Sequence, residues 1–373
     1  MSLISHLSFG KLGDWCAERF TGSVEVAQRV SIETKGQEIV RPEAPAGRRQ
    51  WARVDRTFAL RVAALVQPAP PYSALYGLVR TGLVRPEWGH WQAARYPTHI
   101  RLAAAERARA LDLRPTPTGW LDLTGQRSVE IPLGDDRLSK FKSFHGLMSE
   151  PMLGDFFERS RAYLAMHAPL GQLGAEKGVV RLCWLLSMLE YLYRNNPIDE
   201  HIYQLLRDGT PTVEQLHATA DEGTVAEVVA LVRKLHTSGG LAEMRRLAGN
   251  PPPGRPWGIA RPVFASYWAD NDVLVGGPDG TTLIDVSSVG HTNKLRQSQR
   301  WIWRLLACAW LDTSDVYRIR NVAIYFARHG VLVAWPVEAL AEALLEGDDL
   351  MSARREFLAL ADDLGGRAVP SAG

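Results

Sequence analysis

The chain has 373 residues, of which 46% are hydrophobic and 23% are charged, a balance typical of globular rather than disordered proteins. The formal net charge is only +2, so the charge of the whole chain does not by itself indicate nucleic-acid binding. Residues 1–130 carry more Lys and Arg than Asp and Glu, which fits either a phosphate-facing surface or ordinary Arg usage.

The three cysteines, Cys16, Cys183 and Cys308, are odd in number and far apart in the chain. The last two sit among apolar residues, so the pattern predicts reduced core thiols rather than disulfides or a zinc site. Polar residues interrupt the first fourteen positions, which predicts neither a signal peptide nor a membrane anchor. The apolar run 179–192 is too short to span a bilayer. These patterns predict a cytoplasmic protein with no membrane role.

The N-terminal region combines short predicted elements with Pro-rich connections. Apolar residues at helical spacing predict a helix over 6–20, and the following segment 24–34 has the composition of a strand. A second helix is expected over 51–66, where a Pro-rich segment ends it. An Ala- and Arg-rich helix is expected over 98–112, and the irregular residues after it are the expected linker.

From residue 137 to residue 248 the pattern is helical almost throughout, with Gly, Pro or Asn between the helices. The expected helices are 137–148, 151–167, 175–194, 199–207, 212–219, 224–236 and 239–248. The segment Asn250–Gly254 then separates this part from one that contains strands. Strands are expected at 263–265, 272–275, 282–286, 320–327 and 331–335, with helices at 293–312 and within 336–363.

The chain therefore divides into three expected regions. Residues 1–135 form an Arg-rich region of mixed α/β structure, and residues 136–250 form a helical region. Residues 251–373 form an α/β core with C-terminal helices. The expected fold class is α+β, with a mixed sheet and a large helical portion.

Two acidic residues on neighbouring predicted strands are the best clue to function. Asp272 and Asp285 flank a turn that contains Gly and Pro. Because side chains alternate along a strand, Asp285 and Ser287 share one face of theirs. Asp285 has apolar neighbours inside this strand, so its carboxylate requires a partner or a cleft.

This hairpin is followed by the helix 293–312, with Gln299 in its first turns, and by a closing strand–turn–strand. In this order the segment 260–335 resembles the PD-(D/E)xK nuclease superfamily. The resemblance implies a core of the restriction-endonuclease-like type. It also implies metal-dependent processing of DNA, with a role in defence against foreign DNA. The superfamily motif ends in Lys at the position that Ser287 occupies here.

The resemblance also implies a site for Mg²⁺ or Mn²⁺, since these cations prefer carboxylate oxygens and neutralise charge during phosphodiester hydrolysis. The implied metal ligands are Asp272 and Asp285, with Asp270 as a substitute for Asp272. A helical Glu often completes such a site. Glu190 is the first candidate, because a carboxylate in a nearly all-apolar helix requires a partner, and Glu227 is the second.

Ser287 can donate a hydrogen bond but carries no positive charge, so it cannot replace the motif Lys electrostatically. Two outcomes are open. In the first, Lys294 or His291 supplies the charge, and the catalytic set is Asp272, Asp285, Ser287, Lys294 and Gln299. In the second, the domain has kept its fold and lost its reaction. It then acts as a nucleic-acid-binding or scaffolding subunit, with the Trp-rich helix 295–311 as a contact face for other protein subunits.

Overall fold

The computed structural model describes residues 2–42, 47–80, 83–96, 150–168, 171, 173–193, 202, 205, 211–265, 268–277 and 280–365. The helices expected at 98–112 and 137–148, most of the one at 199–207, and the linker lie outside the described residues. The described part combines helices with a mixed five-stranded sheet, which confirms the α+β class.

The chain forms two compact units. Unit 1 comprises residues 1–45 and 230–373, and unit 2 comprises residues 46–229. This grouping differs from the three consecutive regions expected from the sequence, because the first three helices pack with the C-terminal core. Each unit is therefore described by itself.

Unit 1 is built on a sheet with the strand order β1-β4-β5-β6-β7. The strands are β1 (Gly258–Ala260), β4 (Val273–Gly277), β5 (Gly280–Ser287), β6 (Ile319–Phe326) and β7 (Val331–Pro336), while β2 (Val263–Ala265) and β3 (Ala269–Asp270) form a separate pair. Only β5 and β6 pair in parallel within the five-stranded sheet. A parallel pair needs a crossover connection, which α16 (Leu295–Leu311) provides. The five expected strands are confirmed, whereas β1 and β3 were not expected.

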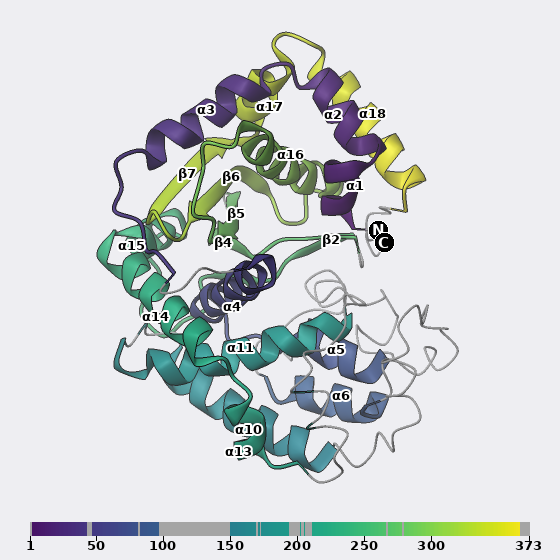
Figure 1. Ribbon diagram of the computed structural model, residues 1–373. Helices are drawn as coiled ribbons and strands as arrows, with labels where there is room; N and C mark the ends of the chain where they lie inside the picture. The colour runs from purple at the N-terminus through teal and green to yellow at the C-terminus, as the bar shows by residue number, and fades with distance from the viewer. Residues whose placement is uncertain are drawn as a thin grey trace. The chain divides into compact units, whose positions relative to one another are not determined.

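One face of the sheet is covered by a layer of helices that includes α16 (Figure 1). The other helices of unit 1 are α1 (Leu3–Phe9), α2 (Lys11–Arg19), α3 (Ser23–Thr34), α15 (Gly240–Leu247), α17 (Val337–Leu345) and α18 (Leu350–Asp363). The expected helix over 6–20 is in fact two helices. Gly10 separates them with an extended backbone, and its N–H donates to the carbonyl of His6 to end α1.

The segment 24–34 is helix α3, so the expected strand there was wrong. Its buried residues Val26, Ala27, Val30 and Thr34 recur at the spacing of one helix face, and they face the core that α16 shares. The indole Nε1 of Trp303 in α16 donates to the hydroxyl of Ser23 at 2.8 Å. Tertiary packing thus outweighs the strand preference of the β-branched residues.

The opposite face of the sheet is also covered. Alternate residues of β6, such as Val322 and Ile324, belong to the core with α16, so Tyr325 points the other way. Gly240 of α15 lies against Tyr325, where an added Cβ would come within 2.7 Å of the ring. The central strand β5 is therefore buried on both faces.

Unit 2 is helical in its described residues. Its helices are α4 (Arg48–Val66), α5 (Tyr72–Arg80), α6 (Pro86–Ala94), α10 (Glu150–His167), α11 (Glu176–Tyr193), α13 (Val213–Ala218) and the first half of α14 (Glu222–Thr237), with the short 3-10 helix η3 (Leu173–Ala175). The central helix α11 contacts α4, α5, α10 and α13. Among the described helices of both units, none combines the length and apolarity that crossing a bilayer requires.

Candidate functional site

The two expected carboxylates lie on the same face of the sheet. Asp285 is on β5, and Asp272 directly precedes β4. Val273 pairs with Ile284, so the antiparallel register places Asp272 opposite Asp285. Both side chains are buried, and they lie on the face that α16 covers. The predicted convergence of the two acids is thus present in the fold.

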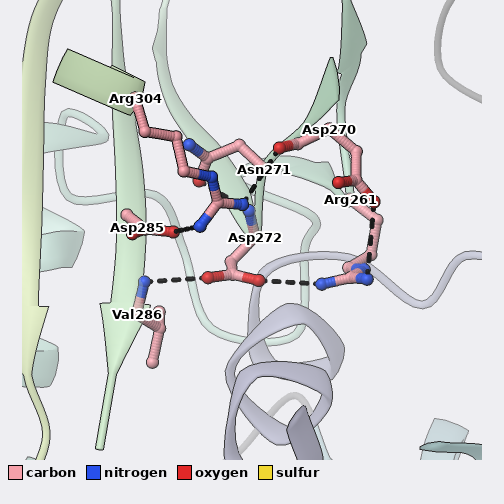
Figure 2. Close-up of polar contacts among 7 residues, drawn as sticks. All are labelled: Arg261, Asp270, Asn271, Asp272, Asp285, Val286 and Arg304. Atoms are coloured by element: carbon pink, nitrogen blue, oxygen red, sulfur yellow. Dashed lines mark hydrogen bonds and ion pairs between the residues drawn. The ribbon is translucent and has the colours of Figure 1, made fainter. Parts of the chain in front are cut away.

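The group that meets Asp285 is a guanidinium. Arg304 of α16 donates from Nη1 to Oδ1 of Asp285 at 2.7 Å. Its other terminal nitrogen, Nη2, donates to the backbone carbonyl of Asp270 at 3.1 Å. Figure 2 shows the guanidinium of Arg304 directed toward the carboxylate of Asp285. The side chain of Asp285 is only 4% exposed and that of Arg304 is 17% exposed, so this ion pair is mostly withdrawn from water.

Asp272 is held by two donors of different kinds. The backbone N–H of Val286 donates to Oδ2 at 2.8 Å, and Nη1 of Arg261 donates to Oδ1, also at 2.8 Å. These contacts place Asp272 between β5 and Arg261, as Figure 2 shows. Both of its carboxylate oxygens therefore accept hydrogen bonds from the protein itself.

Arg261 adopts an unusual backbone conformation to reach its partners. Its φ is 56°, in the left-handed region that costs a residue with a side chain about 1–2 kcal/mol. Its backbone N–H donates to the carbonyl of Asp272 at 2.8 Å, and its Nη2 lies 3.7 Å from Oδ2 of Asp270. The strained turn thus directs one guanidinium toward two carboxylates.

The carboxylates act together on the charge of Arg304. Burial by itself lowers the pKa of Arg304, but Asp285, Asp272 and Asp270 oppose this effect, and the net pKa is raised. Arg304 is therefore a cation at neutral pH. Cys308, one turn further along α16, is buried beside this group, and its pKa is raised to about 12, mainly by burial.

As arranged, these residues do not fit a divalent metal ion. Mg²⁺ and Mn²⁺ require several oxygen ligands at short distance, and here both oxygens of Asp272 and one of Asp285 already accept hydrogen bonds from nitrogen. Within the described ranges, no group of three or more His, Cys, Asp or Glu side chains is placed to hold a metal ion. The acids converge on a cation, but that cation is arginine.

The other expected catalytic residues occupy different surroundings. Ser287 ends β5 and is buried, with Phe326 opposite it on β6. Lys294 is the exposed N-cap residue of α16, and Gln299 is half-buried in that helix. None of the hydrogen bonds or ion pairs described in unit 1 joins Lys294 or Gln299 to the two carboxylates. Their catalytic roles stay predictions.

The two glutamates proposed as additional ligands belong to unit 2. Glu190 lies in α11 and is 2% exposed, and Glu227 lies in α14 and is 6% exposed. Burial of Glu190 agrees with the expectation that this carboxylate needs a partner. A role for either residue as a metal ligand stays a prediction.

Sequence reasoning missed the two arginines that complete the site. Arg304 is the one charged residue in the otherwise apolar segment 301–311 of α16, and this interruption was the available signal. Arg261 had no comparable signal, because its role depends on a left-handed turn that a non-glycine residue rarely adopts.

The Trp-rich face of α16 serves the interior of unit 1. Trp303 is 7% exposed and Trp310 is 3% exposed, and Trp310 packs against Phe20 and Phe357. These tryptophans are therefore core residues, so they do not form the contact face toward other subunits that was expected for 295–311. All three cysteines are buried and unpaired, as expected.

No protein-family model, no curated protein and no solved structure matches the chain.

Proposed function

We propose that unit 1 is a nuclease-like domain that does not cleave phosphodiesters and instead acts as a nucleic-acid-binding or scaffolding subunit. The observation that carries this proposal is the pairing of both carboxylates with arginines, Asp285 with Arg304 and Asp272 with Arg261. A guanidinium supplies positive charge, but it offers no coordination position for an attacking water.

The surrounding residues support the same proposal. The hairpin β4–β5, the crossover helix α16 and the parallel strand β6 follow one another in the order expected for a restriction-endonuclease-like core. Ser287 occupies the place of the motif Lys. This order supports the resemblance, and in the proposal the residues that would perform hydrolysis are altered or paired.

The test is incubation of the purified chain with plasmid and linear DNA in the presence of Mg²⁺ or Mn²⁺, beside Asp285→Ala. We expect neither protein to cleave DNA, and we expect isothermal titration to detect no Mn²⁺ binding to the parent chain at this site. Cleavage that the parent performs and Asp285→Ala loses would overturn the proposal. Cleavage that persists in Asp285→Ala would come from somewhere other than these acids.

Metal-dependent DNA cleavage is the second candidate function, and one observation favours it. Asp285, Asp272 and Asp270 all raise the pKa of Arg304, so three carboxylates surround a single cationic position. A divalent ion would have to displace a guanidinium to use them. A cytoplasmic location, a DNA partner and a role in defence remain predictions from the sequence and its resemblance.

A further inference from the structure

A pocket of about 500 Å³ lies between α6 and α10, and both helices belong to unit 2. Its volume is within the range of roughly 300–1,000 Å³ that is common for small-molecule sites. On each helix, most of the lining residues recur at the spacing of a single helix face. They include Trp88, Trp91 and Arg95 from α6 and its C-cap, and Glu150, Gly154 and Glu158 from α10.

The α6 side of the pocket is an aromatic platform. Trp88 is 9% exposed, and it packs edge to face against Phe157 with ring centroids 5.6 Å apart, which fixes its orientation. Trp91 is 53% exposed, so a large part of its indole is open to solvent. The guanidinium of Arg95 stacks over Trp91 at 4.1 Å from the ring centroid, and an ion pair with Glu158 holds it there. A flat group thus already stacks on this indole.

The charges around the pocket are balanced. Each of the three acidic residues that line it forms an ion pair with an arginine. The pairs are Glu150–Arg85, Asp155–Arg159 and Glu158–Arg95. Paired carboxylate oxygens keep free lone pairs, so they can still accept hydrogen bonds from a ligand. The pocket therefore favours an uncharged ligand that carries N–H or O–H donors.

Gly154 leaves room for a ligand on the α10 side. The indole Nε1 of Trp88 and the amide Nε2 of Gln92 each lie 3.8 Å from the position that a Cβ at Gly154 would take. Gln92 is 2% exposed, and its Nε2 has no hydrogen-bond partner within the described residues. Two N–H donors therefore adjoin the wall of the pocket at the point where a side chain is missing, and they suit a ligand with an acceptor.

We propose that this pocket binds a nucleobase, either of a free nucleoside or of a single-stranded nucleic acid. A base offers a flat ring to Trp91, a carbonyl oxygen or ring nitrogen to the donors beside Gly154, and amino groups to the carboxylates. A saccharide ring is puckered, whereas a base is as flat as the guanidinium that already stacks on Trp91. All of these residues belong to unit 2, so the site does not depend on the acid–arginine site of unit 1.

The first arm of the test is titration calorimetry of the full chain with adenosine and with cytidine, which carry no phosphate. We expect saturable binding to the parent chain. Trp91→Ala removes the exposed ring, so it should weaken binding roughly tenfold or more. Met166→Ala shortens an exposed apolar side chain of α10 outside the pocket lining, and this matched control should bind like the parent.

The second arm uses Gly154→Ala to cover the two donors without disturbing the fold. At 3.8 Å the added methyl makes ordinary van der Waals contacts, and alanine suits a helix better than glycine, so the melting temperature should stay unchanged or rise. The methyl covers the nitrogens of Trp88 and Gln92, and nucleoside binding should therefore weaken about tenfold.

Gly223→Ala is the matched control for this variant. Gly223 also lies in a helix of unit 2, has room for a Cβ and is outside the pocket lining. We expect it to bind nucleoside like the parent. If Gly154→Ala folds and binds nucleoside as tightly as Gly223→Ala, the assigned position of the base is wrong.

The third arm identifies the source of the base with a short fluorescent oligonucleotide, offered as a single strand and as a duplex. Binding of the single strand alone, weakened by Trp91→Ala but not by Met166→Ala, identifies a base of a nucleic acid. Binding of nucleoside without oligonucleotide identifies a free nucleoside. The proposal is overturned if the parent binds neither probe, if it binds maltose or arginine amide in their place, or if Trp91→Ala and Met166→Ala bind equally well.

Discussion

Two arginine sites, one in each unit, differ in their exposure and in their partners. In unit 2, Arg61 of α4 and Glu176 of α11 form an ion pair in which both side chains are 0% exposed. Nε and Nη2 of Arg61 each donate to one carboxylate oxygen, and Nη1 donates to the carbonyl of Ala168. In unit 1, by contrast, Arg304 and Arg261 are 17% and 19% exposed, and each contacts more than one acidic residue.

This difference separates a one-to-one ion pair that joins two helices from a cluster in which three acidic residues share two arginines. The Arg61–Glu176 pair has one acid for one base and no contact with water, so its role is structural. The cluster of unit 1 contains three acids and two arginines and keeps partial access to solvent. Its acids outnumber its arginines, which distinguishes it from the one-to-one ion pair of unit 2.

The largest expected effect is at the buried ion pair between Arg61 and Glu176. Arg61→Leu leaves the carboxylate of Glu176 buried without its counter-charge, so we expect it to lower the free energy of unfolding by about 3–5 kcal/mol. Urea unfolding monitored by circular dichroism measures this change. The double variant Arg61→Leu/Glu176→Leu is the control, and we expect it to recover most of the loss. If the single variant is as stable as the parent chain, the pair is not structural.

An intermediate effect is expected at the acid–arginine cluster. Arg304→Met removes the charge that meets Asp285, but partial exposure and a second arginine limit the damage to roughly 2–3 kcal/mol. Urea unfolding monitored by tryptophan fluorescence measures the change, since Trp303 is adjacent in α16.

Arg304→Met also tests whether the carboxylates of the unit 1 cluster can bind a cation other than arginine. With Arg304 removed, the carboxylates can accept another cation, so we expect Mn²⁺ to raise the melting temperature of Arg304→Met but not that of the parent chain. Arg61→Leu is the matched control, because its single carboxylate cannot form a metal site. An equal response of all three proteins to Mn²⁺ would contradict the expectation that removing Arg304 frees these carboxylates for a cation.

The smallest effect is expected at the surface of unit 2. Arg159 contacts Asp155 and Glu214 at 2.7 Å, and all three side chains are at least 46% exposed. Solvent screens such pairs and side-chain entropy opposes them, so Arg159→Ala should leave the urea midpoint within experimental error. A clear loss of stability would show that exposure does not rank these three arginine sites.

The sequence predicted the elements whose signal is local. The carboxylate hairpin, the helix after it and the closing strands all appear close to their expected bounds, because turn residues and apolar periodicity mark their ends. The segment 24–34 was mistaken for a strand, since Val26 and Val30 favour strands by composition while their spacing fits a helix. Gly10 was overlooked as a break between two helices.

The candidate site was predicted only in part, for a similar physical reason. Asp272 and Asp285 follow from strand alternation and pairing, which are periodic. Their partners depend on long-range packing. Arg304 lies in the crossover helix α16, and Arg261 reaches its partners through a positive φ value that a non-glycine residue rarely adopts. Spacing alone indicated where the acids lie but not which cation they meet.

The division of unit 1 into two separated segments affects how the protein is made. On a ribosome, helices α1 to α3 emerge long before the sheet on which they pack, while residues 46–229 of unit 2 emerge in between. Leu3, for instance, donates its backbone N–H to the carbonyl of Trp268. Domains generally fold as units, so unit 2 can complete its fold during translation while the apolar faces of α1 to α3 await the last third of the chain.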